Sequence, residues 1–245
     1  MRRAAAVTLA VLVSIHALPS ATAEAVLAGS FSAEAPGAPL PAPWQPLFFE
    51  KIPRHTHYEL VSHDGVTVLE ARAERSASAV ARPLDLDPKL YPVLRWRWKV
   101  ANLIEKSAPG RKSGDDYPAR LYITFRRDPR GAGVLDRAWS AMARAVYGVD
   151  PPLAGISYIW ERALPTGSIV PNAYTDRVRM IVVESGRDEV GRWVTEERNV
   201  YEDYRRAFGV DPPMISGLAL MTDTDDTGSS ATAWYGDISF HPAEP

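Results

Sequence analysis

Two stretches of the sequence gather carboxylates beside other groups that can bind a polar ligand. The first spans residues 223–229, Asp-Thr-Asp-Asp-Thr-Gly-Ser. Calcium takes about six to eight oxygen ligands from carboxylates, hydroxyls and carbonyls, so we predict a calcium site formed by Asp223, Asp225 and Asp226. The alternative is a solvated hairpin turn, because Asp and Gly favour turns for conformational reasons. The spacing resembles the start of an EF-hand loop, but Trp234 stands where that pattern requires a glutamate.

The second stretch, residues 114–120, reads Gly-Asp-Asp-Tyr-Pro-Ala-Arg. Side chains alternate along an extended segment, so of the two adjacent carboxylates only Asp116 should share a side with Arg120. An arginine beside a carboxylate suits sugar hydroxyls, since both groups form bidentate hydrogen bonds. The alternative is an internal ion pair between Asp116 and Arg120 that shapes the entrance to a strand.

Aromatic residues on or near predicted strands form a third set, because flat rings stack on sugar faces while polar neighbours bond the hydroxyls. The set is Trp96, Trp98, Trp160, Trp193, Trp234, Tyr122 and Tyr174. For Trp96 and Trp98 we favour core packing, since the other face of their strand carries three cations. Tyr122 instead shares a face with Arg120 and Thr124.

These sets combine into one predicted ligand-binding surface, which consists of Asp116, Arg120, Tyr122, Trp160, Asn172 and Arg179. Glu184 is a weaker member, because alternation over residues 177–184 places it opposite Arg179. The first hypothesis is a binding module, without catalysis, for a glycan or a similar polar ligand of the cell envelope. The second is a carbohydrate-active enzyme with paired carboxylates on the concave face of a sandwich. Its candidate carboxylates are Asp116, Glu161, Glu184 and Asp203.

Other motifs narrow the chemistry. The sequence has no Gly-x-Ser-x-Gly elbow, no His-Glu-x-x-His and no phosphate loop, which favours the binding module. His55-x-His57 is a minimal metal pair without a third ligand nearby, so we interpret both as exposed histidines. The absence of cysteine excludes thiol catalysis, disulfides and lipid attachment. A net charge of −2 argues against nucleic acid or anionic lipid as a partner.

The N-terminus predicts export. Arg2 and Arg3 precede a mostly apolar run over residues 4–18, and Ala-Thr-Ala then ends at Ala23. This pattern indicates a signal peptide over residues 1–23 and a periplasmic or secreted mature protein. The alternative is an uncleaved anchor helix, although the run is shorter than the roughly 20 residues of a membrane span. No later stretch is apolar enough to cross a bilayer.

The remaining sequence predicts an Ala- and Pro-rich leader over residues 24–43 with little core of its own, then one domain over residues 44–241. Within it, short β-type runs are separated by turn signals, including a hairpin around Asp64-Gly65. The runs cover residues 58–62, 66–71, 76–86, 93–100, 120–125, 156–160, 177–184, 194–200, 216–222 and 232–240. They predict an all-β, antiparallel, jelly-roll-like β-sandwich. Helical spacing predicts a helical insertion over residues 134–147 and a short helix over residues 201–208, before Gly209.

Several of these stretches resemble a bacterial family known only as domain of unknown function 3047, a resemblance that implies no activity. They are residues 91–100, 114–122, 198–204, 221–229 and 234–238. A looser resemblance is to jelly-roll carbohydrate-binding modules with a galactose-binding-like fold. There a strand like residues 73–86 precedes a Trp-rich strand, and the last strand closes as Tyr235-Gly-Asp-Ile does here. This second resemblance implies the fold and not the function.

Overall fold

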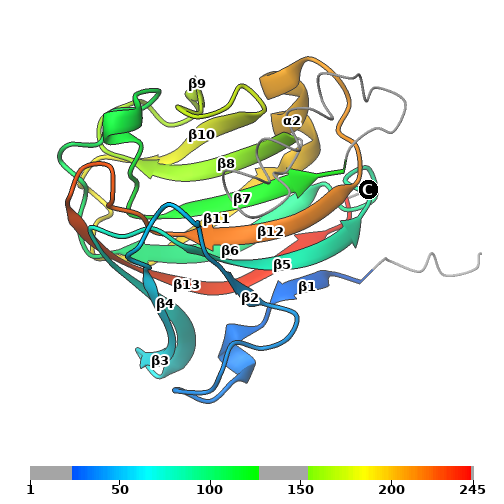
Figure 1. Ribbon diagram of the computed structural model, residues 1–245. Coiled ribbons are helices and arrows are strands. Elements are labelled where there is room, and N and C mark those ends of the chain that lie inside the picture. The colour runs from blue at the N-terminus through cyan, green and yellow to red at the C-terminus, as the bar shows by residue number, and fades with distance from the viewer. Residues whose placement is uncertain (1–23, 127–153, 244–245) are drawn as a thin grey trace, which may run out of the picture.

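The structure is a computed structural model that describes residues 24–126 and 154–243. Two β-sheets pack face to face (Figure 1). Sheet A has the strand order β11-β6-β13-β4-β3, with β1 also paired to β13, and sheet B has the order β2-β5-β12-β7-β8-β10-β9. The structure thus confirms the predicted jelly-roll-like β-sandwich. One pair departs from the antiparallel pattern, because β8 and β10 run parallel.

The strands of sheet A are β1 (Val26–Gly29), β3 (His57–His63), β4 (Val66–Glu74), β6 (Val93–Val100), β11 (Val194–Asn199) and β13 (Ser230–His241). Those of sheet B are β2 (Gln45–Leu47), β5 (Ala79–Leu86), β7 (Arg120–Phe125), β8 (Ala154–Glu161), β9 (Ile169–Pro171), β10 (Val178–Ser185) and β12 (Ile215–Met221). Between strands lie the 3-10 turns η1 (Phe31–Ala33) and η2 (Lys112–Gly114) and the helix α2 (Val200–Phe208).

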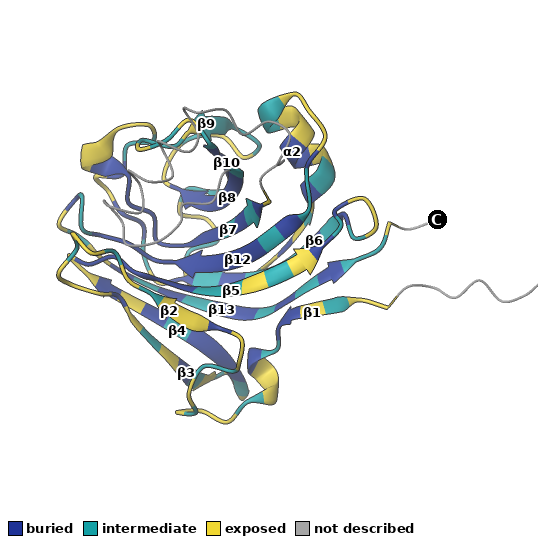
Figure 2. Ribbon diagram, turned by 45° about the vertical axis from the view of Figure 1, so that its right-hand side comes forward, coloured by how far each residue is buried: buried dark blue, intermediate teal, exposed yellow. Residues whose placement is uncertain are grey.

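The core lies between the two sheets, where alternate residues of facing strands meet. On β6 the even positions are buried and the odd positions, which carry the three cations, are half-buried. Trp96 stacks on Tyr158 of β8 with 5.2 Å between the ring centroids. The ring centroids of Trp98 and Trp160 lie 6.1 Å apart. Figure 2 shows buried residues along the strands and exposed ones mainly in the loops. Core packing of Trp96 and Trp98 is therefore confirmed.

Local signals predicted several elements well. In the hairpin between β3 and β4, Asp64 and Gly65 have φ values of 54° and 79°, the two positive values that a type I′ turn requires. Helix α2 begins after Asn199, whose side chain accepts a hydrogen bond from the backbone N–H of Glu202 at 3.0 Å. It ends at Gly209 in the left-handed conformation, which confirms the predicted short helix and its stop.

Two predictions, the signal peptide over residues 1–23 and the helical insertion over residues 134–147, lie outside the described residues. Within residues 24–126 and 154–243, no helix is long and apolar enough to cross a membrane.

The expected leader differs from the structure. Val26–Gly29 adds strand β1 to β13, and Phe31 is fully buried with its ring 5.5 Å from that of Trp44. The Trp44 indole N–H also donates to the carbonyl of Ala28. The short apolar run before the prolines is therefore part of the packed domain, because β13 offers it a strand edge.

Candidate functional site

A buried arginine marks the face of sheet B that is turned away from sheet A, called here the outer face. Arg120, the first residue of β7, is 1% exposed. Its strand neighbours Leu121 and Ile123 fill the inter-sheet core, so alternation directs Arg120 and Tyr122 to the outer face. The predicted face is confirmed, and the structure adds that Arg120 is enclosed there.

The guanidinium of Arg120 is surrounded by hydrogen-bond acceptors. Its Nε donates to Asp223 Oδ1 at 2.9 Å while Nη2 donates to the other oxygen of that carboxylate, a bidentate contact. Its Nη1 donates to Asp115 Oδ2 at 3.3 Å and to the Tyr122 hydroxyl at 3.1 Å. The ring of Tyr117 lies 4.3 Å from the guanidinium carbon. We call Asp115, Asp116, Arg120 and Asp223 the Arg120 cluster; each is at most 3% exposed.

The partner of Arg120 differs from the one that the sequence predicted. Asp115 and Asp223 form ion pairs with Arg120, whereas Asp116 accepts the backbone N–H of Thr227 at 2.6 Å and that of Asp226 at 3.3 Å. The prediction assumed an extended chain before β7. The 3-10 turn η2 and Asp115, with φ −80° and ψ 44°, break that extension. Even spacing from Arg120 therefore did not identify the residue beside it.

Asp116 and Arg120 together hold the acidic turn, defined here as residues 223–227. Asp116 binds its N–H groups and Arg120 binds Asp223 at its start. On the opposite side, Thr224 donates its backbone N–H to the carbonyl of Ser76 at 2.9 Å. Buried groups thus hold the inner side of the turn, and its half-buried residues Asp225 and Asp226 lie at the surface.

Among the described residues, the three carboxylates that could share a metal ion differ from the three predicted by one member. Single oxygens of Asp116, Asp223 and Asp225 lie within 4.8 Å of one another. Asp226 instead accepts the Tyr174 hydroxyl at 2.6 Å. Burial, followed by the charges of Asp116 and Asp226, raises the pKa of Asp225 to about 6. Calcium at this turn stays a prediction, in which the ion would compete with Arg120 for Asp223.

Tyr174 is the exposed aromatic residue of this region. Tyr174 is 45% exposed, and the Lys112 ammonium lies 5.3 Å from the centroid of the Tyr174 ring. The Asn172 side-chain oxygen accepts the backbone N–H of Tyr174 at 3.0 Å, which fixes the loop. We call Lys112, Asn172, Tyr174 and Asp226 the rim. It presents an aromatic face, an amide, an ammonium and a carboxylate side by side.

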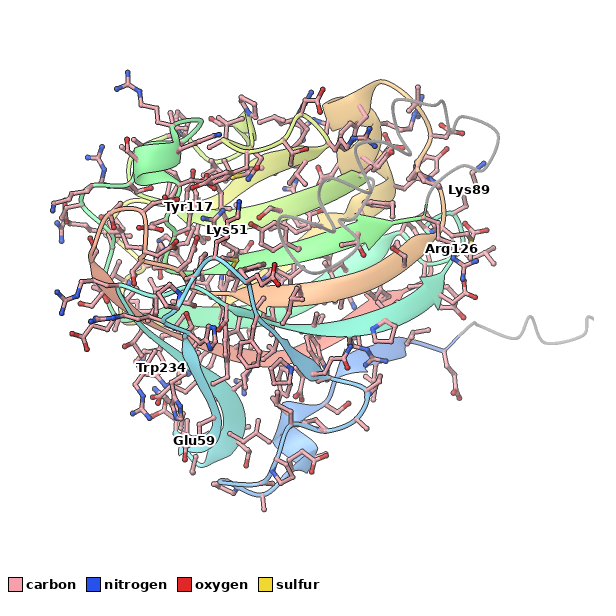
Figure 3. The ribbon with its side chains drawn as sticks, in the orientation of Figure 1. Lys51, Glu59, Lys89, Tyr117, Arg126 and Trp234 are labelled. Atoms are coloured by element: carbon pink, nitrogen blue, oxygen red, sulfur yellow. The ribbon has the colours of Figure 1, made fainter. Side chains whose placement is uncertain are left out.

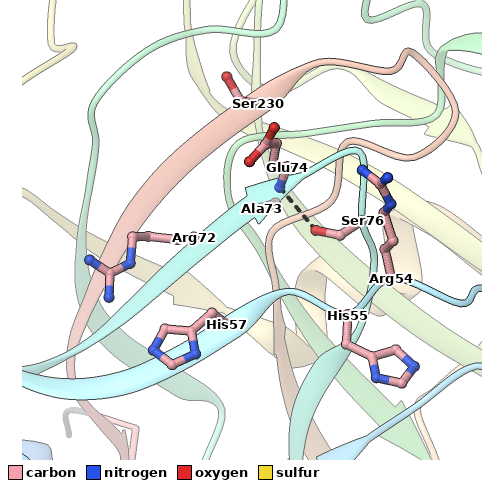
Figure 4. Close-up of a pocket in the computed structure, with 8 residues that line it drawn as sticks. All are labelled: Arg54, His55, His57, Arg72, Ala73, Glu74, Ser76 and Ser230. Carbon is pink, nitrogen blue, oxygen red and sulfur yellow. Dashed lines mark hydrogen bonds between the residues drawn. The ribbon is translucent and has the colours of Figure 1, made fainter.

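An open hollow of about 360 Å³ adjoins the acidic turn at Asp225. Its other charged lining residues are Lys51, Arg54 and Arg75, all exposed. Arg54 also lines a larger hollow of about 690 Å³ together with His55 and His57 (Figure 4).

In the part of the chain that the structure describes, no third metal-capable side chain joins His55 and His57. Among the described residues the group of three metal-capable side chains is the aspartate set above. The His55 ring stacks on Phe48 at 4.3 Å, and His57 Nε2 lies 3.3 Å from Glu59. Both histidines are exposed, as the sequence predicted.

Two predicted surface residues lie elsewhere. Trp160 is fully buried between the sheets, and Arg179 pairs in register with Ile156 on the core-facing side of β10. The Arg179 guanidinium lies 5.5 Å from the ring centroid of Phe208 in α2. The structure therefore brings together Asp116, Arg120, Tyr122 and Asn172 but separates Trp160 and Arg179 from them.

Sequence reasoning missed Asp115, Lys112 and Glu196. The Lys-Ser-Gly-Asp run before Asp116 is a turn signal that argues against an extended chain, and it could have identified Asp115. Glu196 is only 8% exposed and accepts the Trp98 indole N–H at 3.1 Å. Its register on β11, opposite Trp96, indicates a core-facing position in a run of charged residues.

A family model described as "Protein of unknown function (DUF3047)" matches residues 42–239, more than half of the 245 residues. No curated protein matches.

Among solved structures, the family 11 carbohydrate-binding module of cellulase Lic26A-Cel5E of Clostridium thermocellum is similar at TM-score 0.43 and 12% identity, over 90% of this chain and 95% of that one. The family 30 module of Cel9D-Cel44B of Clostridium thermocellum gives TM-score 0.41 and 11% identity, over 91% and 100%. The CBM22-1 xylan-binding domain of Paenibacillus barcinonensis Xyn10C gives 0.38 and 11%, over 90% and 97%. At these values we infer function from this chain's own residues.

Proposed function

The chain belongs to the family of proteins of unknown function DUF3047, and we propose that it is a non-catalytic module that binds a glycan or a similarly polar ligand of the cell envelope. The observation that carries the proposal is the rim beside the acidic turn. There an exposed aromatic ring, Tyr174, stands between an ammonium and a carboxylate. Rings of this kind cover the apolar face of a sugar, while the polar groups bond its hydroxyls.

The Arg120 cluster supports binding by holding the rim in place. Asp226 is fixed through Asp116, and Tyr174 is fixed through both Asp226 and Asn172. Side chains that are already ordered lose little conformational entropy when a ligand arrives. The hollow beside Asp225 offers cationic donors next to the same turn.

The carboxylates favour binding over acid–base chemistry. Asp223 accepts the guanidinium of Arg120 with both oxygens, and Asp116 accepts backbone N–H groups with both of its own. Glycoside hydrolysis needs two carboxyl groups that reach the substrate from either side of the scissile bond. In the acidic turn, Asp225 is half-buried, and burial raises its pKa to about 6.

We further propose that the module acts outside the cytoplasm. The pattern of residues 1–23 supports export by signal peptidase cleavage after Ala23. A location outside the cytoplasm would place the module beside the glycans of the cell envelope, which supports that ligand class.

The proposal is tested with a glycan array, followed by a hydrolysis assay on every glycan that binds. Wild type and Tyr174→Ala are compared with Tyr201→Ala, a matched control because Tyr201 also carries a cation, Arg205, near its ring. We expect binding without turnover in wild type and Tyr201→Ala, and loss of binding in Tyr174→Ala. Turnover that disappears in Asp225→Asn would establish the enzyme instead. An array without any hit would refute both.

A further inference from the structure

The face of sheet A that is turned away from sheet B carries two tryptophans outside the core. Trp193 and Trp234 are half-buried. The ring of His63 lies between them, 5.5 Å from Trp193 and 5.0 Å from Trp234, and meets both edge-on. In Figure 3, Trp234 lies beside β4 on the sheet A side of the molecule, away from Tyr117 and Lys51 on the sheet B side.

Each of these indoles packs against a cation from β6. The Arg97 guanidinium lies 4.8 Å from the ring centroid of Trp193, and the Lys99 ammonium lies 5.5 Å from that of Trp234. Arg97 and Lys99 occupy alternate positions on one strand, so their Cα atoms are roughly 7 Å apart. Both side chains are half-buried, unlike those of a freely solvated charged face.

A glycine makes room for one of the cations. Gly236 of β13 lies directly under Arg97, and a Cβ at that position would fall 2.5 Å from Arg97 Cγ and Nε. Any side chain there would displace the guanidinium from Trp193. The absence of a side chain at Gly236 therefore helps to position Arg97 beside Trp193.

The charges of Arg97 and Lys99 are not neutralised within the described part of the chain. No carboxylate there forms an ion pair with either. Glu70, which is paired in register with Trp234, accepts the Trp234 indole N–H at 2.9 Å and pairs with Arg72 at 3.2 Å. Lys99 Nζ instead lies 3.4 Å from His63 Nε2. Each of the two cations therefore lies beside an indole without a paired carboxylate among the described residues, and the carboxylate of Asp64 contacts His63 instead, at 3.0 Å from Nδ1.

We propose that His63, Arg97, Lys99, Trp193 and Trp234, the tryptophan–cation platform, form a second binding site that takes an acidic glycan with carboxylate-bearing sugar rings. The rings stack on the indoles, and the carboxylates accept hydrogen bonds from Arg97 and Lys99. The site lies on the opposite sheet from the rim, so it adds a ligand class to the proposed function and depends on different residues.

The experiment is calorimetric titration of the mature protein with a trigalacturonate, and with the corresponding neutral trigalactose. We expect the acidic trisaccharide to bind and the neutral one to bind at least tenfold more weakly. Lys99→Met, which keeps an unbranched apolar stem, and Trp193→Ala should each weaken trigalacturonate binding by roughly tenfold or more. Lys89→Met makes the same charge change at an exposed lysine paired with Asp211 and should leave the affinity unchanged.

Tyr174→Ala separates this site from the rim, because it should leave trigalacturonate affinity at the wild-type value even if the rim binds no glycan. Unchanged melting temperatures in the platform variants show that the fold is intact. Equal affinities for the acidic and neutral sugars, no binding of either, or equal losses in Lys99→Met and Lys89→Met would each overturn the proposal. So would tighter binding of a single-stranded oligonucleotide, which would assign the platform to nucleic acid.

Discussion

The proton that buried Glu196 retains should make the stability of this fold fall as pH rises. Glu196 on β11 accepts the Trp98 indole N–H, and it lies near Glu184 on β10 of the other sheet. Burial, followed by the charge of Glu184, raises the pKa of Glu196 from 4.5 to about 7. We expect the variant Glu196→Gln to lose the resulting pH dependence.

The sign follows from which state holds the proton. Between pH 4.5 and about 7 the unfolded chain has released the proton of Glu196, while the folded protein retains it. The stabilisation is therefore fully present below pH 4.5 and is lost as pH rises to about 7. A shift of this size corresponds to about 3 kcal/mol. For a chain of this length, that is roughly 6–12 °C in melting temperature.

Glutamine is neutral at every pH, and its side-chain oxygen can still accept the Trp98 indole N–H. Glu196→Gln should therefore match wild type near pH 4.5 and exceed its free energy of unfolding by about 3 kcal/mol at about pH 8. Urea denaturation across this range measures the difference. Glu197→Gln, which changes the exposed neighbour paired with Arg95, is the control and should retain the wild-type slope. Parallel slopes for all three proteins would refute the raised pKa of Glu196.

Three further predictions concern the cluster, the metal and export. Arg120→Met should lower the free energy of unfolding by about 3–5 kcal/mol, because it leaves buried carboxylates without a counter-charge. The control Arg126→Met, which removes an exposed ion pair with Asp85, should lower it by less than about 1 kcal/mol. Urea denaturation measures both values, and similar losses in the two variants would contradict the role of Arg120. If the acidic turn binds calcium, a chelator should lower the melting temperature, and Asp225→Ala should abolish that sensitivity; identical melting with and without calcium leaves a plain turn. Mass spectrometry of the exported protein should give a chain that begins at Glu24, and an intact segment 1–23 would contradict the signal peptide.

Local patterns predicted the elements that depend on local rules. Alternation assigned the faces of β6 and β7 correctly, because one face of each strand fills the core. Positive φ at Asp64-Gly65 and the glycine stop of α2 are likewise properties of a few neighbouring residues.

The site depends on contacts that no local rule contains. Arg120 meets Asp223 across 103 positions of the sequence, and Asp116 meets Thr227 across 111. The choice of Asp115 over Asp116 follows from a single turn of 3-10 helix. Trp160 and Arg179 lie away from the site because strand register, which the sequence alone does not provide, turns both toward the core.

The most direct test of the central claim is a double-mutant cycle on the rim, measured by calorimetry with the glycan that binds most tightly on the array. Tyr174→Phe keeps the ring but removes the hydroxyl that Asp226 accepts, and Asp226→Asn removes the carboxylate charge. If the ligand contacts both Tyr174 and Asp226, each single variant should weaken binding by roughly fivefold or more. The affinity loss in the double variant should then be smaller than the product of the two single losses. Wild-type affinity in both single variants and in Tyr174→Ala would show that the glycan binds elsewhere and would contradict the proposed site.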